Sequence, residues 1–275
     1  MAPKRKSTLS QNPLRSRAST SSDHTPSHIR FRDEKAKSDF FKNFSRWGIH
    51  SERQVILSNF FNTDLPTIIH SKEWESLCDV SVICPSVLIQ EFYSNMHGFD
   101  FSVPFFITRV RGTRIVVTSE IISDVLCVPR VEHPDYPDYD CLKIVSKDKL
   151  NSTFCKRPSD WGEHQFTCCS GFAKGPWFLN MVMTFVLHPL SHYNSITEPH
   201  ARFLLSLLEH LNIDFPSHFI LSIIEVYRNS ATHDKLIFPS AIMRILRHFF
   251  VPFPMSDHFS YMGVIDTATV KRSEA

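Results

Sequence analysis

Four residues that could ligate a metal lie close together in the middle of the chain: Cys155, His164, Cys168 and Cys169. Structural zinc needs four convergent nitrogen or sulfur ligands, and two of them usually sit in a CxxC-type turn. The sequence has no CxxC, and adjacent cysteines point in different directions. We therefore expect no metal site here, and we interpret these cysteines as reduced thiols that pack as small apolar groups.

Two histidines have a spacing that also suits a metal. His188 and His192 are four residues apart, which places two side chains on one face of a helix. Pro189 lies between them and is expected to end the helix, and no Glu stands next to His188 as in helical zinc proteases. We therefore interpret both histidines as capping or surface residues.

One aspartate lies in a short sequence that is typical of a protease. Ile265-Asp266-Thr267-Ala268 differs by one alanine from the apolar-Asp-Thr-Gly sequence of retroviral-type aspartic proteases. Only seven residues follow Ala268, and a β-rich protease body needs many more. We therefore expect no protease activity.

The other acidic residues show no pattern that demands convergence on a catalytic metal. A transposase needs several carboxylates around divalent cations. The candidates are scattered along the chain: Asp100, Asp124, Asp138, Asp160 and Glu225. There is also no Asp-Asp pair, no GxSxG, no GxGxxG and no P-loop. The sequence predicts no catalytic residue, no cofactor and no enzyme activity.

A loose series of basic residues with aromatic neighbours could bind single-stranded nucleic acid. The series comprises Lys143, Lys147, Lys149, Lys156 and Arg157, and it surrounds Phe154 and Trp161. Acidic residues interrupt the series. We therefore favour a solvated loop whose two aromatic side chains are anchored in the core.

Regular elements must position such residues, and the clearest of them begins at Phe105. Two β-type runs, Phe105–Val110 and Arg114–Val117, flank a turn in which Gly112 supplies the positive φ. Thr118 or Ser119 can then cap an apolar-periodic helix. The pattern predicts a β-hairpin followed directly by a helix.

Other segments show the apolar spacing of helices. They are Lys35–Trp47, Leu65–Leu77, Pro85–Met96, Ser146–Leu150, Trp177–Leu187, Glu198–Leu211, Ser217–Ser230 and Ser240–Phe250. Prolines separate the last of these segments, because proline interrupts a helix and suits the first turn of the next. We predict a mainly α fold, with a multi-helix bundle-like body, one small β-hairpin and a disordered N-terminal tail.

The expected organisation has five parts. Residues 1–33 are predicted to be a disordered basic tail, and 34–130 an N-terminal helical lobe with the hairpin. Residues 131–175 form an irregular connection, 176–266 a C-terminal helical lobe, and 267–275 a second tail. We expect the two lobes to form one domain.

Composition and charge indicate an intracellular protein. The seven cysteines are an odd number, and no apolar signal segment precedes them. The most apolar run, Trp177–Leu190, is too short to span a bilayer, so no membrane partner is expected. Residues 1–37 hold nine Lys or Arg against three Asp or Glu, a net charge of +6, whereas the remainder carries −4. Within the tail, Lys4, Arg5 and Lys6 form a candidate nuclear-import cluster.

Several short sequences together resemble one plant family. They are Phe40-Phe41 with Arg46, Glu52-Arg53, Glu91-Phe92-Tyr93-Ser94-Asn95, Val110-Arg111-Gly112 with the helix Ile121–Pro129, Pro189 with Thr197, and Gly263-Val264-Ile265-Asp266. The chain resembles the "putative plant transposon protein" domain, which occurs beside gypsy-type retroelements, over residues 40–266. The resemblance implies a plant source and descent from a mobile element, and it supplies no activity, cofactor or catalytic residue.

Two hypotheses follow. The first is a non-catalytic helical interaction module, derived from a transposable element, that works through protein or nucleic-acid contacts. The second is a DNA-binding or transposase-related protein that uses the basic tail for phosphate contacts.

Overall fold

The protein is described by a computed structural model, which describes residues 29–80, 84–138, 140–156, 167–168, 171–190, 195–229, 235–252 and 264–266. Helices occupy 53% of these residues and strands 15%. The candidate nuclear-import residues Lys4, Arg5 and Lys6 lie outside the described residues.

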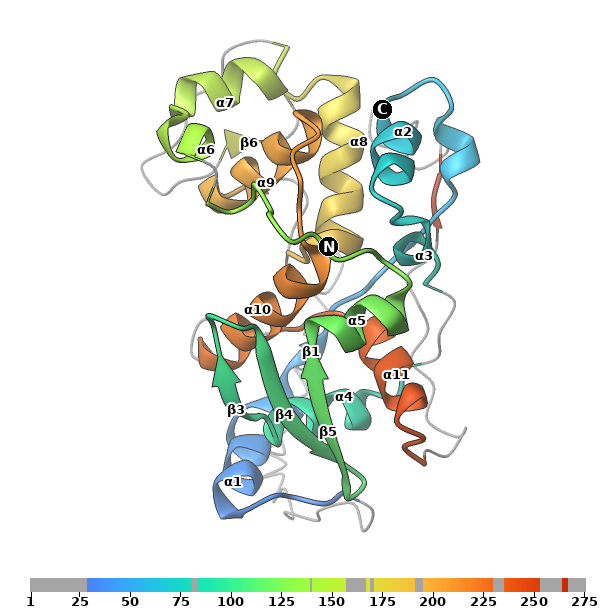
Figure 1. The fold of residues 1–275 in the computed structure, drawn as a ribbon, viewed down its shortest axis with the longest axis vertical. Helices are drawn as coiled ribbons and strands as arrows, with labels where there is room; N and C mark the ends of the chain where they lie inside the picture. The colour runs from blue at the N-terminus through green and yellow to red at the C-terminus, as the bar shows by residue number, and fades with distance from the viewer. Residues whose placement is uncertain are drawn as a thin grey trace, which may run out of the picture.

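A three-stranded antiparallel sheet forms one side of the molecule (Figure 1). Its central strand β4 (Phe105–Val110) pairs with β3 (His97–Asp100) and β5 (Thr113–Thr118). The turn between β4 and β5 has φ values of 52° at Arg111 and 87° at Gly112. A two-residue hairpin turn of type I′ requires positive φ at both positions. The predicted hairpin is therefore confirmed, but Arg111 shares the unusual backbone expected of Gly112 alone.

The helix after the hairpin begins where the sequence predicts. In α5 (Ser119–Leu126), the side chain of Thr118 accepts a hydrogen bond from the backbone N–H of Ile121. The helix ends at Cys127, which adopts a left-handed conformation with φ 54°. The cap is confirmed, and the helix ends before the predicted proline.

Each predicted helix coincides with a helical segment, although the ends differ. The segments up to the hairpin are α1 (Glu34–Lys42), η1 (Phe44–Arg46), η2 (Leu57–Phe60), α2 (Leu65–Ser71), α3 (Glu75–Cys78) and α4 (Ser86–Ser94). Those after α5 are α6 (Asp140–Ile144), α7 (Lys147–Phe154), α8 (Lys174–Val182) with its π-helical continuation η4 (Met183–Leu187), α9 (Glu198–Leu208), α10 (Phe215–Arg228) and α11 (Pro239–His248).

The prediction of a mainly α, bundle-like body with a single hairpin was wrong: the described part of the chain has a mixed α/β fold. The third strand β3 was missed because Gly98, with φ 64°, interrupts its alternation and shifts its register. Three further pairings join distant segments. They are β1 (Gly48–Ile49) with β8 (Lys235–Leu236) and β2 (Gln54–Val55) with β9 (Val264–Ile265), both parallel, and β6 (Thr167–Cys168) with β7 (Ser195–Ile196), antiparallel. Two residues are too few to show a strand period.

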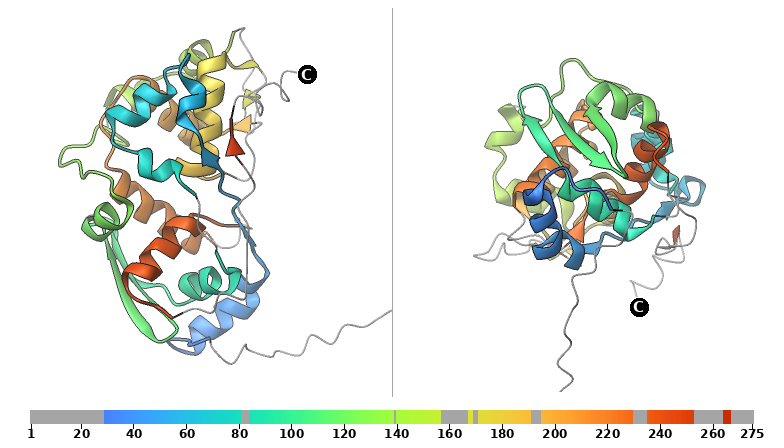
Figure 2. Two further views of the ribbon diagram at one scale, coloured as in Figure 1. Left: turned by 90° about the vertical axis from the view of Figure 1, so that its right-hand side faces the viewer. Right: turned by 90° about the horizontal axis from the view of Figure 1, so that it is seen from below.

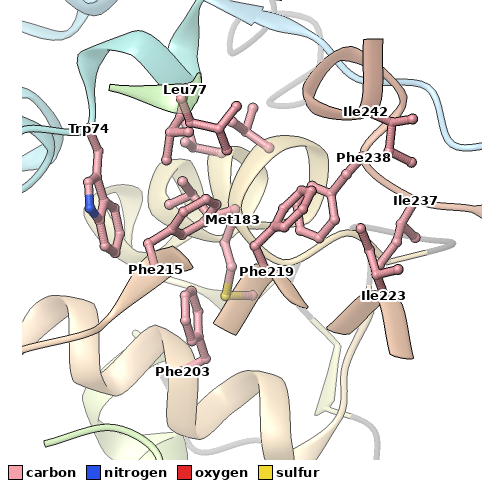
Figure 3. Packing of buried hydrophobic residues seen from close by; sticks show 14 of the residues in the cluster. Trp74, Leu77, Met183, Phe203, Phe215, Phe219, Ile223, Ile237, Phe238 and Ile242 are labelled. Atoms are coloured by element: carbon pink, nitrogen blue, oxygen red, sulfur yellow. The ribbon is translucent and has the colours of Figure 1, made fainter. Parts of the chain in front are cut away.

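The hydrophobic core extends through both predicted lobes. A continuous cluster of buried side chains draws on residues from Phe44 to Ile265. Figure 3 shows its centre, where Phe215 and Phe219 of α10 lie among side chains from other elements. The ring of Phe219 packs 4.7 Å from that of Phe238, and Phe215 packs 5.3 Å from Trp74. The phenylalanine-rich composition therefore serves a core that holds the sheet and helices together.

The centre of the core can be tested by truncating one ring. Phe219→Ala should lower the free energy of unfolding by about 3–5 kcal/mol, because the fully buried ring leaves a cavity. Phe61→Ala is the matched control, since Phe61 is 78% exposed, and it should change stability by about 0.5 kcal/mol or less. Urea unfolding of both variants measures the difference, and equal losses would contradict this core assignment.

Candidate functional site

A cleft of about 850 Å³ crosses the middle of the molecule. Its floor is one face of α10, which runs between the sheet and the group formed by α6, α7 and α9 (Figure 1). Its walls come from residues 101–104 after β3, from the loop 130–138 and from residues 188–190 after η4. We call this feature the central cleft. It is the place where candidate functional side chains from distant segments meet.

Three histidines form one cluster in the wall of the central cleft. His188 follows η4, His200 lies in the first turn of α9, and His218 lies on α10. Nδ1 of His188 lies 2.8 Å from Nε2 of His218, and the rings of His188 and His200 have centroids 4.1 Å apart. The ring of Phe203 stacks on His218 at 4.7 Å. The cluster is therefore a stack of rings joined by a ring–ring hydrogen bond.

The environment of the cluster favours neutral imidazoles. Burial lowers the pKa of His188 to about 4, and burial together with the neighbouring His188 and His218 lowers the pKa of His200 to about 2. Burial also holds the pKa of His218 well below its ordinary value. A neutral imidazole has one donor and one acceptor nitrogen, which suits the bond between His188 and His218. Among the described residues, no group of three His, Cys, Asp or Glu has an arrangement that could hold a metal ion.

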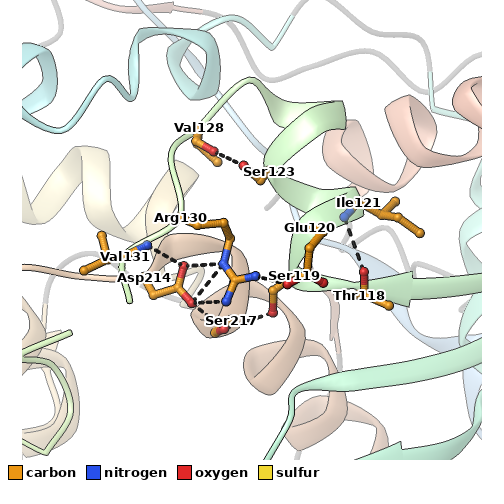
Figure 4. Close-up of polar contacts among 10 residues, drawn as sticks. All are labelled: Thr118, Ser119, Glu120, Ile121, Ser123, Val128, Arg130, Val131, Asp214 and Ser217. Carbon is orange, nitrogen blue, oxygen red and sulfur yellow. Dashed lines mark hydrogen bonds and ion pairs between the residues drawn. The ribbon is translucent and has the colours of Figure 1, made fainter. Parts of the chain in front are cut away.

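An arginine joins the start of α5 to the start of α10 (Figure 4). The guanidinium of Arg130 donates to both carboxylate oxygens of Asp214, at 3.0 Å from Nε and 3.1 Å from Nη2, and it also donates to Glu120. Ser217 donates its hydroxyl proton to Asp214 and lies 2.9 Å from the hydroxyl of Ser119. These groups bond to one another, and together they link the N-terminal ends of α5 and α10.

The structure describes only some of the residues that the sequence offered for catalysis and metal binding. Cys155 donates weakly to Asn151, whereas His164, Cys169 and His192 lie outside the described residues. Ile265 is fully buried in β9, where it pairs with β2, and the other half of the protease-like sequence is not described. The structure therefore assigns a core position to the apolar residue of that motif.

Two of the scattered acidic residues line the same cleft. Asp138 and Glu225 both line the central cleft, although nothing in their sequence positions indicates it. Asp100 instead accepts hydrogen bonds from Ser102 and Val103 in the loop after β3. Asp124 is exposed on α5, and Asp160 lies outside the described residues.

Two lysines of the basic series around Phe154 form ion pairs, whereas Phe154 itself lies in the core. Lys143 lies 3.3 Å from Asp138, Lys147 lies 3.8 Å from Glu198, and Phe154 is fully buried. This confirms the core position expected for Phe154. Arg157 and Trp161 lie outside the described residues.

Sequence reasoning missed His200, His218, Arg130 and Asp214. His188 was considered only with His192, four positions away, whereas its partners lie on α9 and α10. The position of His218, a polar residue on the apolar face of α10, was the one feature of the sequence that could have indicated the cluster. The pairing itself depends on the tertiary fold.

Comparison with known families gives a match over most of the chain. The model of the family described as Putative plant retrotransposon-related domain matches residues 70–252. No curated protein and no solved structure matches the chain. None of the helices in the described residues combines the length and apolar character that crossing a bilayer requires.

The histidine cluster predicts a pH dependence that one substitution should reduce. The pKa values of the three histidines in the folded protein lie below the value of about 6.5 that a histidine has in the unfolded chain. Below pH 6.5 the unfolded chain therefore binds more protons than the folded protein. The stability that these groups contribute is lost as pH falls below 6.5. Glu52 and Glu91 oppose this trend, because burial raises both pKa values to about 7. Between pH 7 and pH 5, His200→Asn should therefore lose about 1–2 kcal/mol less stability than the unchanged protein.

Urea unfolding at the two pH values measures this difference. His210→Asn is the control, because His210 is exposed and its positive φ of 54° suits asparagine. Identical pH profiles for His200→Asn and the unchanged protein would show that the cluster does not resist protonation.

Proposed function

We propose that this chain, which belongs to the Putative plant retrotransposon-related domain family with residues 70–252 matched, is a non-catalytic binding module. Its central cleft holds a basic, partly apolar peptide segment of a protein partner. The observation that carries this proposal is the composition of the cleft, which combines exposed carboxylates with apolar and proline-rich walls.

The charges along the central cleft favour a cationic ligand. Among the described residues that line it, Arg130 is the one cation, and Asp214 and Glu120 compensate its charge. The lining carboxylates are Glu132, Asp138, Asp214 and Glu225. Lys143 neutralises Asp138, but no described residue forms an ion pair with Glu132 or Glu225. The resulting field attracts basic side chains and repels phosphate groups.

The walls of the cleft favour a chain segment over a small ion. Phe101 is 49% exposed and Val103 is 68% exposed, both in the loop after β3. Prolines from four separate segments add rigid apolar surface: Pro104, Pro134, Pro137, Pro189 and Pro199. Exposed apolar side chains of this kind bind partner side chains with little loss of conformational freedom.

The polar groups of the cleft support a role without catalysis. The hydroxyl of Ser217 donates to Asp214, and Nε2 of His218 bonds to His188. A nucleophile needs a base within hydrogen-bond reach, with a third group that orients the base. In the described part of the cleft, the Ser217 hydroxyl therefore bonds to a carboxylate instead of an imidazole. The hydroxyl of Thr197 does lie within hydrogen-bond reach of Nδ1 of His200, but the pKa of His200 is lowered to about 2, which makes it a poor general base. This supports binding as the activity of the module.

A second candidate function is DNA binding through the basic tail, with nuclear import directed by Lys4, Arg5 and Lys6. It is supported by the net charge of +6 over residues 1–37, which suits phosphate contacts. Truncation of residues 1–28 should then abolish binding to duplex DNA, and residues 29–33 should be retained because they contact α4.

The binding proposal can be tested with two synthetic peptides. A fluorescent ten-residue peptide of Lys, Leu and Pro should bind the full chain, and its counterpart with Glu in place of Lys should not. Glu132→Gln with Glu225→Gln should weaken binding about tenfold at low salt, because both carboxylates face the cleft. Fluorescence anisotropy measures both affinities.

The matched control removes two acidic charges elsewhere. Glu34→Gln with Glu209→Gln changes exposed residues of α1 and the end of α9 and should leave the affinity unchanged. Equal binding of the two peptides would contradict the proposal. Metal-dependent DNA cleavage by the purified protein, abolished by one Asp or Glu substitution, would contradict its non-catalytic character.

A further inference from the structure

The outer face of the three-stranded sheet is open. Both views in Figure 2 show helices on one side of the sheet only. The covered side is apolar and fully buried: Phe106 packs on Phe92 of α4, and Thr108 donates to the backbone carbonyl of Phe92. On the outer side, the corresponding residues of β4 and β5 are half-buried or exposed. This face has no partner among the described residues.

Two arginines stand opposite each other on this outer face. Arg109 of β4 and Arg114 of β5 are direct partners in the antiparallel register, and both are exposed. No described acidic residue forms an ion pair with either side chain. Like charges directly opposite one another destabilise a sheet. The pair therefore costs stability in the isolated protein, and an anionic ligand would reverse that cost.

A third arginine lies at the same end of the sheet. The side-chain amide of Asn95 donates to the backbone carbonyls of both Arg30 and Arg109, at 2.9 and 2.8 Å, so these two residues lie side by side. The Arg30 side chain is exposed. By contrast, the side chain of Arg111 is 7% exposed and faces the buried carboxylate of Glu91. Arg30 thus lies beside the end of β4 that carries Arg109, and we call these three exposed residues, Arg30, Arg109 and Arg114, the arginine cluster.

Rings and aliphatic side chains continue the face away from the arginine cluster. Ile107 lies between His97 on β3 and Val116 on β5, and Phe105 comes next along β4. All four side chains are partly exposed. Aromatic side chains on an open sheet are surfaces on which unpaired bases stack, while neighbouring cations contact the phosphates.

We propose that this face binds single-stranded nucleic acid, with phosphates on the arginine cluster and bases against Phe105 and His97. A flat surface with rings favours unpaired bases, because a duplex keeps its bases stacked inside. An acidic peptide would use the arginines but gain nothing from ring stacking. The site is independent of the central cleft, so it can fail or hold separately from the proposed peptide binding.

The test uses the full chain with fluorescent oligo-dT of twenty nucleotides, oligo-U of the same length and a duplex, followed by anisotropy across a salt series. Arg109→Gln with Arg114→Gln should weaken binding to the single strands about tenfold and reduce the slope of log affinity against log salt by about 1.4. Phe105→Leu should weaken it about fivefold with an unchanged slope, because the ring is lost and the charges remain.

The control is Lys42→Gln with Lys174→Gln, which removes two exposed charges from α1 and α8 and should leave affinity nearly unchanged. The arginine variant should keep or increase its melting temperature, since the like-charge pair is gone. Affinity equal to that of the control variant would overturn the site. Tighter binding of the duplex, or equally tight binding of polyglutamate, would overturn the single-stranded ligand.

Discussion

The carboxylate of Glu91 is the interaction on which the sheet half of the structure depends. Its side chain is fully buried at the end of α4, where one oxygen accepts hydrogen bonds from the backbone N–H groups of Arg30 and Arg111, at 3.0 and 2.8 Å. The other oxygen lies 3.5 Å from Nε of Arg111. A helix, a hairpin turn and the entering chain therefore meet at one acid. Burial raises the pKa of Glu91 to about 7, so its contribution to stability falls as pH rises from about 4.5 to 7.

This arrangement also decides which arginines remain available. Arg111 accepts a left-handed backbone, which orients its N–H toward Glu91, and its guanidinium is held inside. Arg109 lies two positions before Arg111, and Arg114 lies two positions after Gly112, so both alternate to the open face. The central cleft follows the same principle, because Arg130 is compensated by Asp214 and Glu120 while Glu132 and Glu225 face the ligand space. On the open sheet face and in the central cleft, the charged side chains that form no ion pair with another described residue determine which ligand we expect.

The sequence predicted the local elements well and the tertiary relations poorly. The hairpin at Gly112, the cap at Thr118 and the helix α10 depend on turn chemistry and apolar spacing within a few residues, which a single sequence displays. The parallel pairing of Val55 with Ile265 depends on packing between remote segments, so it left no local signal. The histidine cluster was missed for the same reason. Glu91 and Arg111 carried the resemblance to the plant family, and their contact gives those positions a physical role.

Amide hydrogen exchange in the Glu91→Ala variant tests the role of this carboxylate most directly. Loss of the carboxylate leaves the N–H groups of Arg30 and Arg111 without their acceptor, so exchange should accelerate in residues 29–32 and 110–113. Protection in α9 and α10, which belong to the core beyond the sheet, should persist. Unchanged exchange in both segments would contradict the claim that Glu91 joins the hairpin turn, α4 and the entering chain.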